Sequence, residues 1–420
     1  RPAPVERAEG PRAGNGTRGS GLAADSAASA SASTERESTW PPAARWTVSL
    51  LIVALGALLL LPSARRWATT EIAALEWSAI RSNEGTPLHL VGPSVALDSS
   101  GDALLIAFGN ETMHPQRLNP RVMRLRGVAG DVAVWTSVPI PDTTAVPQPR
   151  WFGAAAHDAT TDQLALFGGA LGLTSPCLAD TWLLRTDSLG QRRWSRVSTR
   201  GDGPTPRADA RLAFDAARMR LVVHGGTDCF TVHYLDTWIL TFDDATFRGG
   251  TWQQVRVDSS AGAPGAIPGR SVVIDAAADR LFLLAGRGGA AGREVVWLLE
   301  GIGDSLARWR RLTCANAPPA LSQRALTYDA GSSALVAFGG YDATDRFSNE
   351  VWRLDALDAS AAACTWTRIP TGSYAPAPRA AGFAGVSRHS GDLVIFGGTN
   401  GSTHFSDAWR LRGVLPPRAR

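Results

Sequence analysis

The chain has 420 residues, of which 44% are hydrophobic and 19% charged, so its composition is that of a globular protein with one large repeat domain or two to three ordinary domains. All 42 basic residues are arginine, and the formal net charge is only +4. This charge is too small for the basic surface that nucleic-acid binding requires, so we expect no nucleic-acid partner.

Residues 1–45 are rich in Ala, Ser, Gly and Pro and contain almost no large apolar side chain before Trp40. Such a segment cannot bury enough apolar surface to order itself, so a disordered tail is predicted. The G-x-G-x-x-G pattern at Gly14–Gly19 has no strand before it and no helix after it, so it does not indicate a dinucleotide site.

Residues 46–62 are almost entirely apolar and are flanked by Arg45 on one side and by Arg65 and Arg66 on the other. As a helix, the stretch from Trp46 to Leu61 would rise about 24 Å, somewhat less than a ~30 Å hydrocarbon core. The segment predicts a membrane anchor that holds the remaining chain outside the cytoplasm. The alternative is a cleaved signal sequence, which would leave a secreted or periplasmic protein.

A tryptophan stretch recurs at intervals of 58, 59, 58, 57 and 57 residues in the remainder of the chain. Its members are Trp77, Trp135, Trp194, Trp252, Trp309 and Trp366. A period this regular indicates a repeat architecture.

Each unit of about 57 residues contains four short apolar runs separated by turn residues. In the unit from Gly153 onward, the first run ends in Asp158, the second ends in the pair Gly168-Gly169, and the third carries Trp182. The fourth run is the tryptophan stretch. No sustained helical period is present, so each unit predicts a four-stranded antiparallel sheet. Radial stacking of such sheets gives a propeller.

The units resemble the Kelch repeat, the propeller family that includes the central domain of galactose oxidase. The resemblance rests on the glycine pair after the second run, the Asp-x-Trp that opens the third, the tryptophan of the fourth, and Pro-x-Arg-like approaches to the first, and it covers about residues 72–413. The first unit departs from it at Gly109-Asn110 and Met123, and the fourth at Ala285-Gly286 and Glu294.

The first three runs occur six times, whereas the last unit lacks its fourth run at the C-terminus. An unassigned fourth run is present around Trp77. We therefore predict an all-β, six-bladed propeller over residues 72–413 in which residues 72–82 form the outer strand of the last blade and close the ring.

Arginines precede the first strand in five units and are expected on one face near the central channel. They are Arg150, Arg207, Arg270, Arg324 and Arg379. They could form a site for an anion or acidic ligand. The preferred alternative is that each arginine ties a loop to its neighbour.

The loops after the second strands lie on the same face and add further candidate ligand-binding residues, namely His233, Tyr234, Tyr341, Asp342 and His404. Cys177 and Cys229 occupy two such loops in consecutive blades and could form a disulfide. Cys314 follows a fourth strand and Cys364 precedes one, so these two are expected on opposite faces and unpaired.

No catalytic motif, cofactor motif or metal-ligand cluster is recognisable, so no cofactor and no enzyme activity are predicted. The sequence favours a binding module, membrane-tethered or exported, that recognises a protein or glycan ligand with one loop face. The alternatives are a carbohydrate-acting enzyme on the same scaffold and the sensory ectodomain of a larger receptor that is truncated at the N-terminus.

Overall fold

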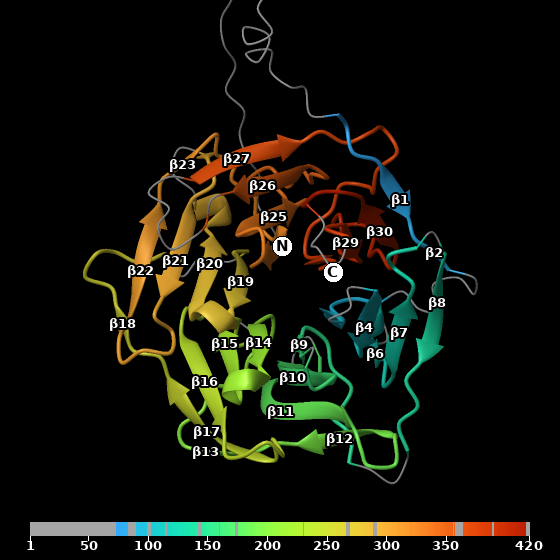
Figure 1. Ribbon diagram of the computed structural model, residues 1–420, viewed down its shortest axis with the longest axis vertical. Helices are drawn as coiled ribbons and strands as arrows, with labels where there is room; N and C mark the ends of the chain where they lie inside the picture. Colours follow the sequence, from blue (N-terminus) through green and yellow to red (C-terminus); the bar gives the residue numbers. More distant parts are fainter. Residues whose placement is uncertain are drawn as a thin grey trace, which may run out of the picture. The chain divides into compact units, whose positions relative to one another are not determined.

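The computed structural model describes residues 73–416 except 83–89, 99–101, 114–115, 131, 142–144, 159, 173–174, 230, 266–268, 289–291, 356, 358–363 and 389. Six antiparallel sheets are arranged radially, with the first strand of each near the centre and the fourth at the outside (Figure 1). The described residues therefore form the predicted all-β, six-bladed propeller.

The first three blades contain four main strands each. Blade 1 consists of β3 (Ser94–Leu97), β4 (Ala103–Ala107), β7 (Val122–Arg126) and β8 (Val132–Ser137), with a hairpin of β5 (Asn110–Met113) and β6 (Gln116–Leu118). Blade 2 consists of β9 (Ala154–Asp158), β10 (Gln163–Ala170), β11 (Cys177–Thr186) and β12 (Arg192–Arg196). Blade 3 consists of β14 (Arg211–Asp215), β15 (Arg220–His224), β16 (Thr237–Phe242) and β17 (Gly249–Gln254).

The second half of the ring repeats this plan. Blade 4 consists of β19 (Ser271–Asp275), β20 (Arg280–Leu284), β21 (Val296–Glu300) and β22 (Ala307–Leu312). Blade 5 consists of β24 (Ala325–Asp329), β25 (Ala334–Phe338), β26 (Val351–Asp355) and β27 (Cys364–Ile369). Blade 6 consists of β28 (Phe383–Val386), β29 (Leu393–Phe396), β30 (Ala408–Leu411) and β1 (Trp77–Ala79). The helical elements among the described residues are the short 3-10 turns η2 (Ala216–Arg218), η3 (Ala276–Ala278) and η4 (Gly286–Gly288).

The core lies between neighbouring blades, and the periodic tryptophans build it. The ring of Trp252 on β17 packs edge-on against Phe167 at the end of β10 in the preceding blade, with ring centroids 5.7 Å apart. Trp77 packs in the same way on Phe338 of blade 5 at 5.5 Å. Because each tryptophan fills the space behind the second strand of the preceding blade, its spacing equals the blade repeat.

The N-terminal strand β1 pairs antiparallel with β30, with Trp77 opposite Leu411 and Ala79 opposite Trp409. The next two residues, β2 (Arg81–Ser82), instead pair in parallel with β8 of blade 1. The single strand predicted over residues 72–82 is therefore wrong in its extent, since residues 77–79 pair with blade 6 and residues 81–82 pair with blade 1.

Short parallel strands extend four of the blades at their outer edge. They are β2, β13 (Ser198–Arg200), β18 (Val257–Asp258) and β23 (Cys314–Ala315), which pair with β8, β17, β22 and β27. Each of them follows the fourth strand of the preceding blade in the ring, so the linker runs along the next blade before it turns inward. The linker into blade 2 carries Pro139 and Pro141, which lack the N–H groups that such a ladder requires.

The predicted membrane localisation requires correction. No helix formed by the described residues is long and apolar enough to cross a membrane. The tail predicted at 1–45 and the hydrophobic helix predicted at 46–62 lie outside the described residues.

Candidate functional site

Three of the five predicted arginines form the same set of hydrogen bonds, each within its own blade; we call this set the arginine tie. Arg150, Arg207 and Arg379 each lie four residues before the first strand of their blade. Each guanidinium donates to both carboxylate oxygens of the aspartate that opens the third strand, with Nη2–Oδ2 distances of 3.0 Å to Asp180, Asp236 and Asp407. Each also donates to the carbonyl of the first glycine of the pair, at 2.9, 2.9 and 3.1 Å.

These ties are internal supports of the frame. The three arginine side chains have almost no exposed surface. Burial acts to raise the pKa of Asp180 and of Asp236, but hydrogen bonds and charge from Arg150 and Arg207 outweigh it and lower both pKa values. The same aspartates accept from the tryptophan two residues on, at 2.7 Å. We therefore assign these three arginines a structural role. This is the alternative preferred in the sequence analysis, in which each arginine ties a loop to its neighbour.

The glycine pairs let one blade approach the next. In blade 2 the Gly169 N–H donates to the Arg207 carbonyl of blade 3 at 2.9 Å. Gly168 has φ = +63°, and a Cβ on it would lie 2.4 Å from the same carbonyl oxygen. Only glycine fits this position, because both the space and the backbone conformation exclude a side chain.

Arg324 and Arg270 occupy a different position, immediately before β24 and β19. The Arg324 side chain is buried, lies 3.6 Å from the buried carboxylate of Glu294 and donates to the carbonyls of Gly339 and Pro319 at 3.0 and 2.9 Å. Burial raises the pKa of Glu294 and lowers that of Arg324. Arg324 therefore also has a structural role.

Arg270 differs from the other four arginines. Its guanidinium donates to the carbonyls of Gly265 and Tyr234, both at 2.9 Å. Within the described part of the chain it forms no ion pair with a carboxylate. Burial lowers its pKa to about 10, so the side chain remains charged at neutral pH. A half-buried cation whose positive charge is not neutralised is the principal electrostatic feature of the candidate site.

Arg270 lines a cavity of about 430 Å³ that is built from blades 2 to 5. Blade 2 contributes Trp151 and Phe152, and blade 5 contributes Gln323 and Tyr341. Blade 3 supplies the largest share of the wall, comprising Ala208, Asp209, Arg211, His224, Gly225, Gly226, Thr227, Cys229, His233 and Tyr234. Asp209 and Arg211 pair with each other at 3.0 Å, so their charges offset and Arg270 gives the cavity its positive character.

His224 is a cavity residue that the sequence-based prediction missed. It stands at the end of β15, where blades 2, 5 and 6 have Phe167, Phe338 and Phe396. It packs against Trp309 and its Nδ1 lies 2.9 Å from Thr237 Oγ1. Burial, assisted by the charge of Arg270, lowers its pKa to about 3, so the imidazole is neutral. The break in the phenylalanine pattern was the signal that could have revealed it.

The predicted loop residues divide into two groups. His233, Tyr234 and Tyr341 line the cavity with Arg270. Asp342 instead accepts from the Thr344 hydroxyl at 2.7 Å and from the N–H groups of Thr344 and Arg346 at 2.8 and 3.1 Å, and these turn contacts lower its pKa below the usual range. His404 is an exposed residue of blade 6 and does not line the cavity.

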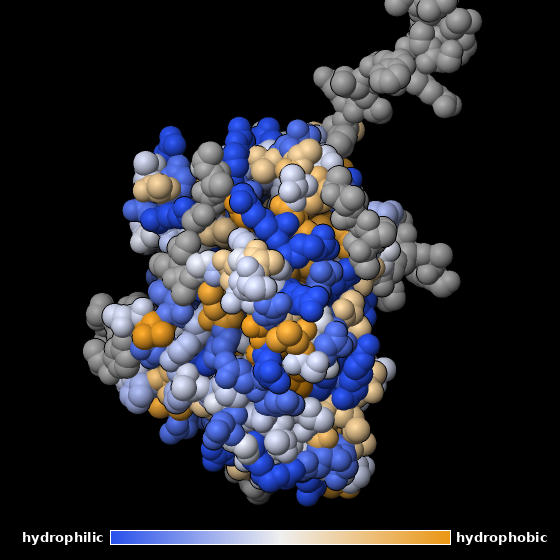
Figure 2. Space-filling model, turned by 90° about the vertical axis from the view of Figure 1, so that its left-hand side faces the viewer, coloured by the Kyte–Doolittle hydropathy of each residue, from blue (hydrophilic) through white to orange (hydrophobic). Residues whose placement is uncertain are grey.

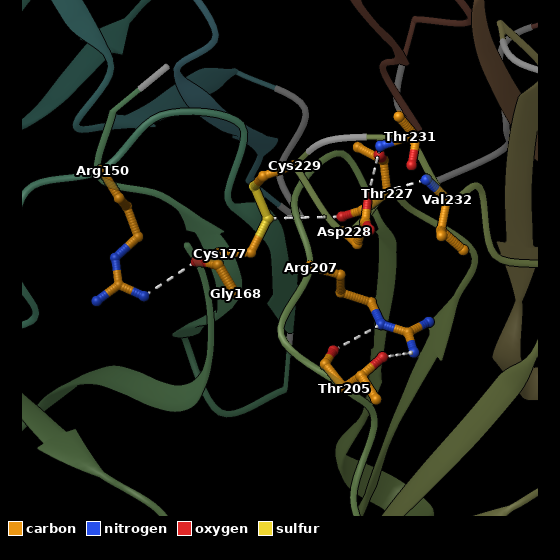
Figure 3. Close-up of a disulfide and its surroundings, with 10 residues drawn as sticks. All are labelled: Arg150, Gly168, Cys177, Thr205, Arg207, Thr227, Asp228, Cys229, Thr231 and Val232. Atoms are coloured by element: carbon orange, nitrogen blue, oxygen red, sulfur yellow. Dashed lines mark hydrogen bonds between the residues drawn. A yellow bond between two sulfur atoms is a disulfide. The ribbon is translucent and has the colours of Figure 1, made fainter. Parts of the chain in front are cut away.

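Two disulfides are present. Cys177 and Cys229 are joined between blades 2 and 3, with Cα atoms 5.7 Å apart (Figure 3). Cys314 and Cys364 are also joined, with Cα atoms 4.5 Å apart, so the prediction that they remain apart is wrong. The reason is the parallel outer strand: β23 places Cys314 directly opposite Cys364 in the ladder with β27.

The outer rim of the ring is a weaker candidate for a functional site than the cavity around Arg270. On the side of the ring that Figure 2 shows, hydrophilic side chains predominate and apolar ones form small separate patches. The described residues contain no group of three or more His, Cys, Asp or Glu side chains that could hold a metal ion. The cavity around Arg270 is therefore the strongest candidate for a functional site in the described part of the chain.

The ring of four-stranded blades, the glycine pairs and the arginine ties define the Kelch class of β-propeller. A family model described as the KLHDC2/KLHL20/DRC7 Kelch-repeats domain matches residues 65–286 and 246–414. The chain belongs to this Kelch-repeat family.

Individual relatives are more distant. The F-box/kelch-repeat protein At1g51550 of Arabidopsis thaliana is 25% identical over 259 residues, which are 56% of this chain and 52% of that protein. The chain thus spans about half the length of that curated relative. The structure of YjhT matches with a TM-score of 0.51 at 15% identity, covering 77% of this chain and 94% of that one. A cryo-EM structure of RAG with one melted and one unmelted RSS matches with a TM-score of 0.53 at 14% identity, covering 80% and 99%. At these identities, the two structures show a common fold.

Proposed function

We propose that the propeller is a non-catalytic protein-interaction module whose cavity binds an acidic segment of a partner protein. The observation that carries this proposal is Arg270, a half-buried cation without a carboxylate partner among the described residues, in a cavity of about 430 Å³. Charge-assisted hydrogen bonds are stronger than neutral ones, and a carboxylate would satisfy this group. The aromatic residues Trp151, Phe152, Tyr234 and Tyr341 provide apolar walls of the kind that line interaction hot spots.

The test is the affinity of a fluorescein-labelled hexaglutamate peptide, measured by anisotropy, with labelled hexalysine as the negative probe. The Arg270→Ala variant should bind hexaglutamate at least tenfold more weakly, because a hydrogen bond to a charged group contributes about 1.5–3 kcal/mol. Arg308→Ala is the matched control, since Arg308 lies on the outer strand β22 with 73% of its side chain exposed.

The control should bind within twofold of the wild type. The proposal fails if hexaglutamate does not bind the wild type, or if Arg270→Ala leaves the affinity unchanged.

We further propose that the short pairing of β1 with β30 closes the ring. It is supported by the register of Trp77 opposite Leu411 and by the packing of Trp77 on Phe338. Deletion of residues 70–82 should lower the melting temperature or produce an open ring that aggregates, as judged by calorimetry and light scattering. An unchanged melting temperature together with a monomeric deletion variant would refute closure by this segment.

A further inference from the structure

The disulfide between Cys177 and Cys229 connects the wall of the cavity to the neighbouring blade. Cys177 is the first residue of β11 in blade 2, and Cys229 lies in the loop that follows β15 in blade 3. Cys229 itself lines the cavity, as does Thr227 two residues earlier. Figure 3 shows the bridge spanning the two loops.

A small apolar cluster surrounds this disulfide. It contains Trp151, Ala170, Cys177 and Ala208, with Val91, Leu118, Phe152 and Cys229 packed against them. Five members of the cluster also line the cavity, namely Trp151, Phe152, Ala170, Ala208 and Cys229. The disulfide is therefore part of the structure on which this side of the cavity wall is built.

The described backbone–backbone hydrogen bonds of the Cys229 loop are internal to blade 3, while the side chain of Arg270 in blade 4 donates to the Tyr234 carbonyl at 2.9 Å. Thr227 N donates to Ala208 O at 2.9 Å, Asp228 N to Val232 O at 3.1 Å, and Tyr234 N to Gly226 O at 2.9 Å. Cys229 has φ = +71°, a left-handed conformation that is unfavourable for a residue with a side chain and persists only where surrounding contacts impose it. Asp228 Oδ1 closes this turn by accepting from the N–H groups of Thr231 and Val232, both at 2.9 Å, and the covalent bond to Cys177 attaches the turn to blade 2.

We propose that thiol–disulfide exchange at Cys177–Cys229 regulates ligand binding by the cavity. The oxidised protein holds the loop and binds, whereas the reduced protein releases the loop and binds weakly. This inference rests on the proposed binding function of the cavity, and it adds the regulation of the same site.

The exchange requires a dithiol reductant. A reductant thiolate attacks Cys229 Sγ, the more accessible sulfur because Cys177 is only 6% exposed, and Cys177 leaves as a thiolate that takes up a proton. The second reductant thiol then attacks the mixed disulfide and releases Cys229 as a thiol. The protein gains two electrons and two protons, and the dithiol becomes a disulfide.

The second disulfide supplies a matched control. Cys314 and Cys364 are register partners in the ladder of β23 with β27, so hydrogen bonds already hold the two strands together. Neither residue lines the cavity. Reduction or removal of this bridge should leave the cavity unchanged.

The experiment measures labelled hexaglutamate binding by the full chain before and after reduction with dithiothreitol, in the wild type and in the double variants C177S/C229S and C314S/C364S. We expect at least fivefold weaker binding by the reduced wild type and by C177S/C229S, the latter without any further response to the reductant. C314S/C364S should bind as the wild type does and keep the full response.

Hydrogen–deuterium exchange of residues 226–234 gives a readout that does not depend on the probe. Exchange should accelerate at least tenfold in the reduced wild type and in C177S/C229S, but not in oxidised C314S/C364S. Unchanged exchange, with mass spectrometry confirming free thiols at 177 and 229, overturns the inference, and so does unchanged binding by the reduced wild type. If exchange accelerates but hexaglutamate binds no form of the protein, the binding function fails while the control of the wall by the disulfide stands.

Discussion

Blades 2 and 6 follow the repeat, whereas the junction of blades 3 and 4 departs from it twice. In blades 2 and 6 an arginine four residues before the first strand is neutralised by an aspartate, and a phenylalanine on the second strand precedes the glycine pair. At the junction His224 replaces that phenylalanine, and Arg270 is not paired with a carboxylate among the described residues. Both departures line the same cavity. In a repeat protein, positions that break the pattern without being compensated in the frame indicate where function has been added.

The largest contrast is expected between Arg207→Ala and Arg270→Ala. Arg207→Ala leaves the carboxylate of Asp236 without its buried partner and should lower the free energy of unfolding by about 3–5 kcal/mol. Arg270→Ala removes hydrogen bonds to two carbonyls only and should cost about 1–2 kcal/mol. Urea denaturation of the two variants measures both values. Equal losses would contradict the division between frame and site.

A smaller contrast is expected between two glycines that both have positive φ. Gly168→Ala places a Cβ 2.4 Å from the Arg207 carbonyl, whereas Gly190→Ala meets nothing within 4 Å. Both variants incur the left-handed penalty of about 1–2 kcal/mol, and only Gly168→Ala adds an overpacking cost of about 1–3 kcal/mol. Thermal denaturation should therefore rank Gly168→Ala as less stable. If the two variants melt together, the close approach of blades 2 and 3 is not rigid.

These frame positions could be predicted from the sequence because they recur at fixed offsets. The tryptophans, the glycine pairs and the Asp-x-Trp motif each repeat in most units, and their periodicity specified the blades and their number. The arginines could not be assigned in this way. From the sequence, all five look equivalent because each lies shortly before a first strand, but they occupy two different positions. Arg150, Arg207 and Arg379 lie four residues before it and Arg270 and Arg324 one residue before it, and only the first position reaches the aspartate.

The remaining errors come from segments too short to carry a pattern. The outer parallel strands contain two or three residues, so no alternation of side chains reveals them. Without them the pairing of Cys314 with Cys364 and the division of residues 77–82 between two blades could not be foreseen. The cavity itself depends on tertiary packing across four blades, which a linear pattern does not encode.

The smallest expected effect is the contribution of His224 to the pH dependence of stability. The pKa of this group is about 3 in the folded protein, below its usual value near 6.5, so the unfolded chain binds more protons between these values. The free energy of unfolding therefore keeps the full contribution of neutral His224 above about pH 6.5. As the pH falls toward 3 this contribution is lost, by about 1.4 kcal/mol per pH unit at most. His224→Phe restores the repeat and removes this loss. Urea denaturation from pH 7 to pH 5 should show a weaker pH dependence for the variant, and equal slopes would contradict a neutral, buried His224.

The most direct test of the binding site is a crystal structure of the oxidised protein in complex with the hexaglutamate peptide. We predict a peptide carboxylate within hydrogen-bonding distance of the Arg270 guanidinium, about 2.7–2.9 Å, and the adjoining peptide against Phe152 and Tyr341. A peptide bound to the arginines of the outer rim, with the cavity around Arg270 unoccupied, would contradict the assignment.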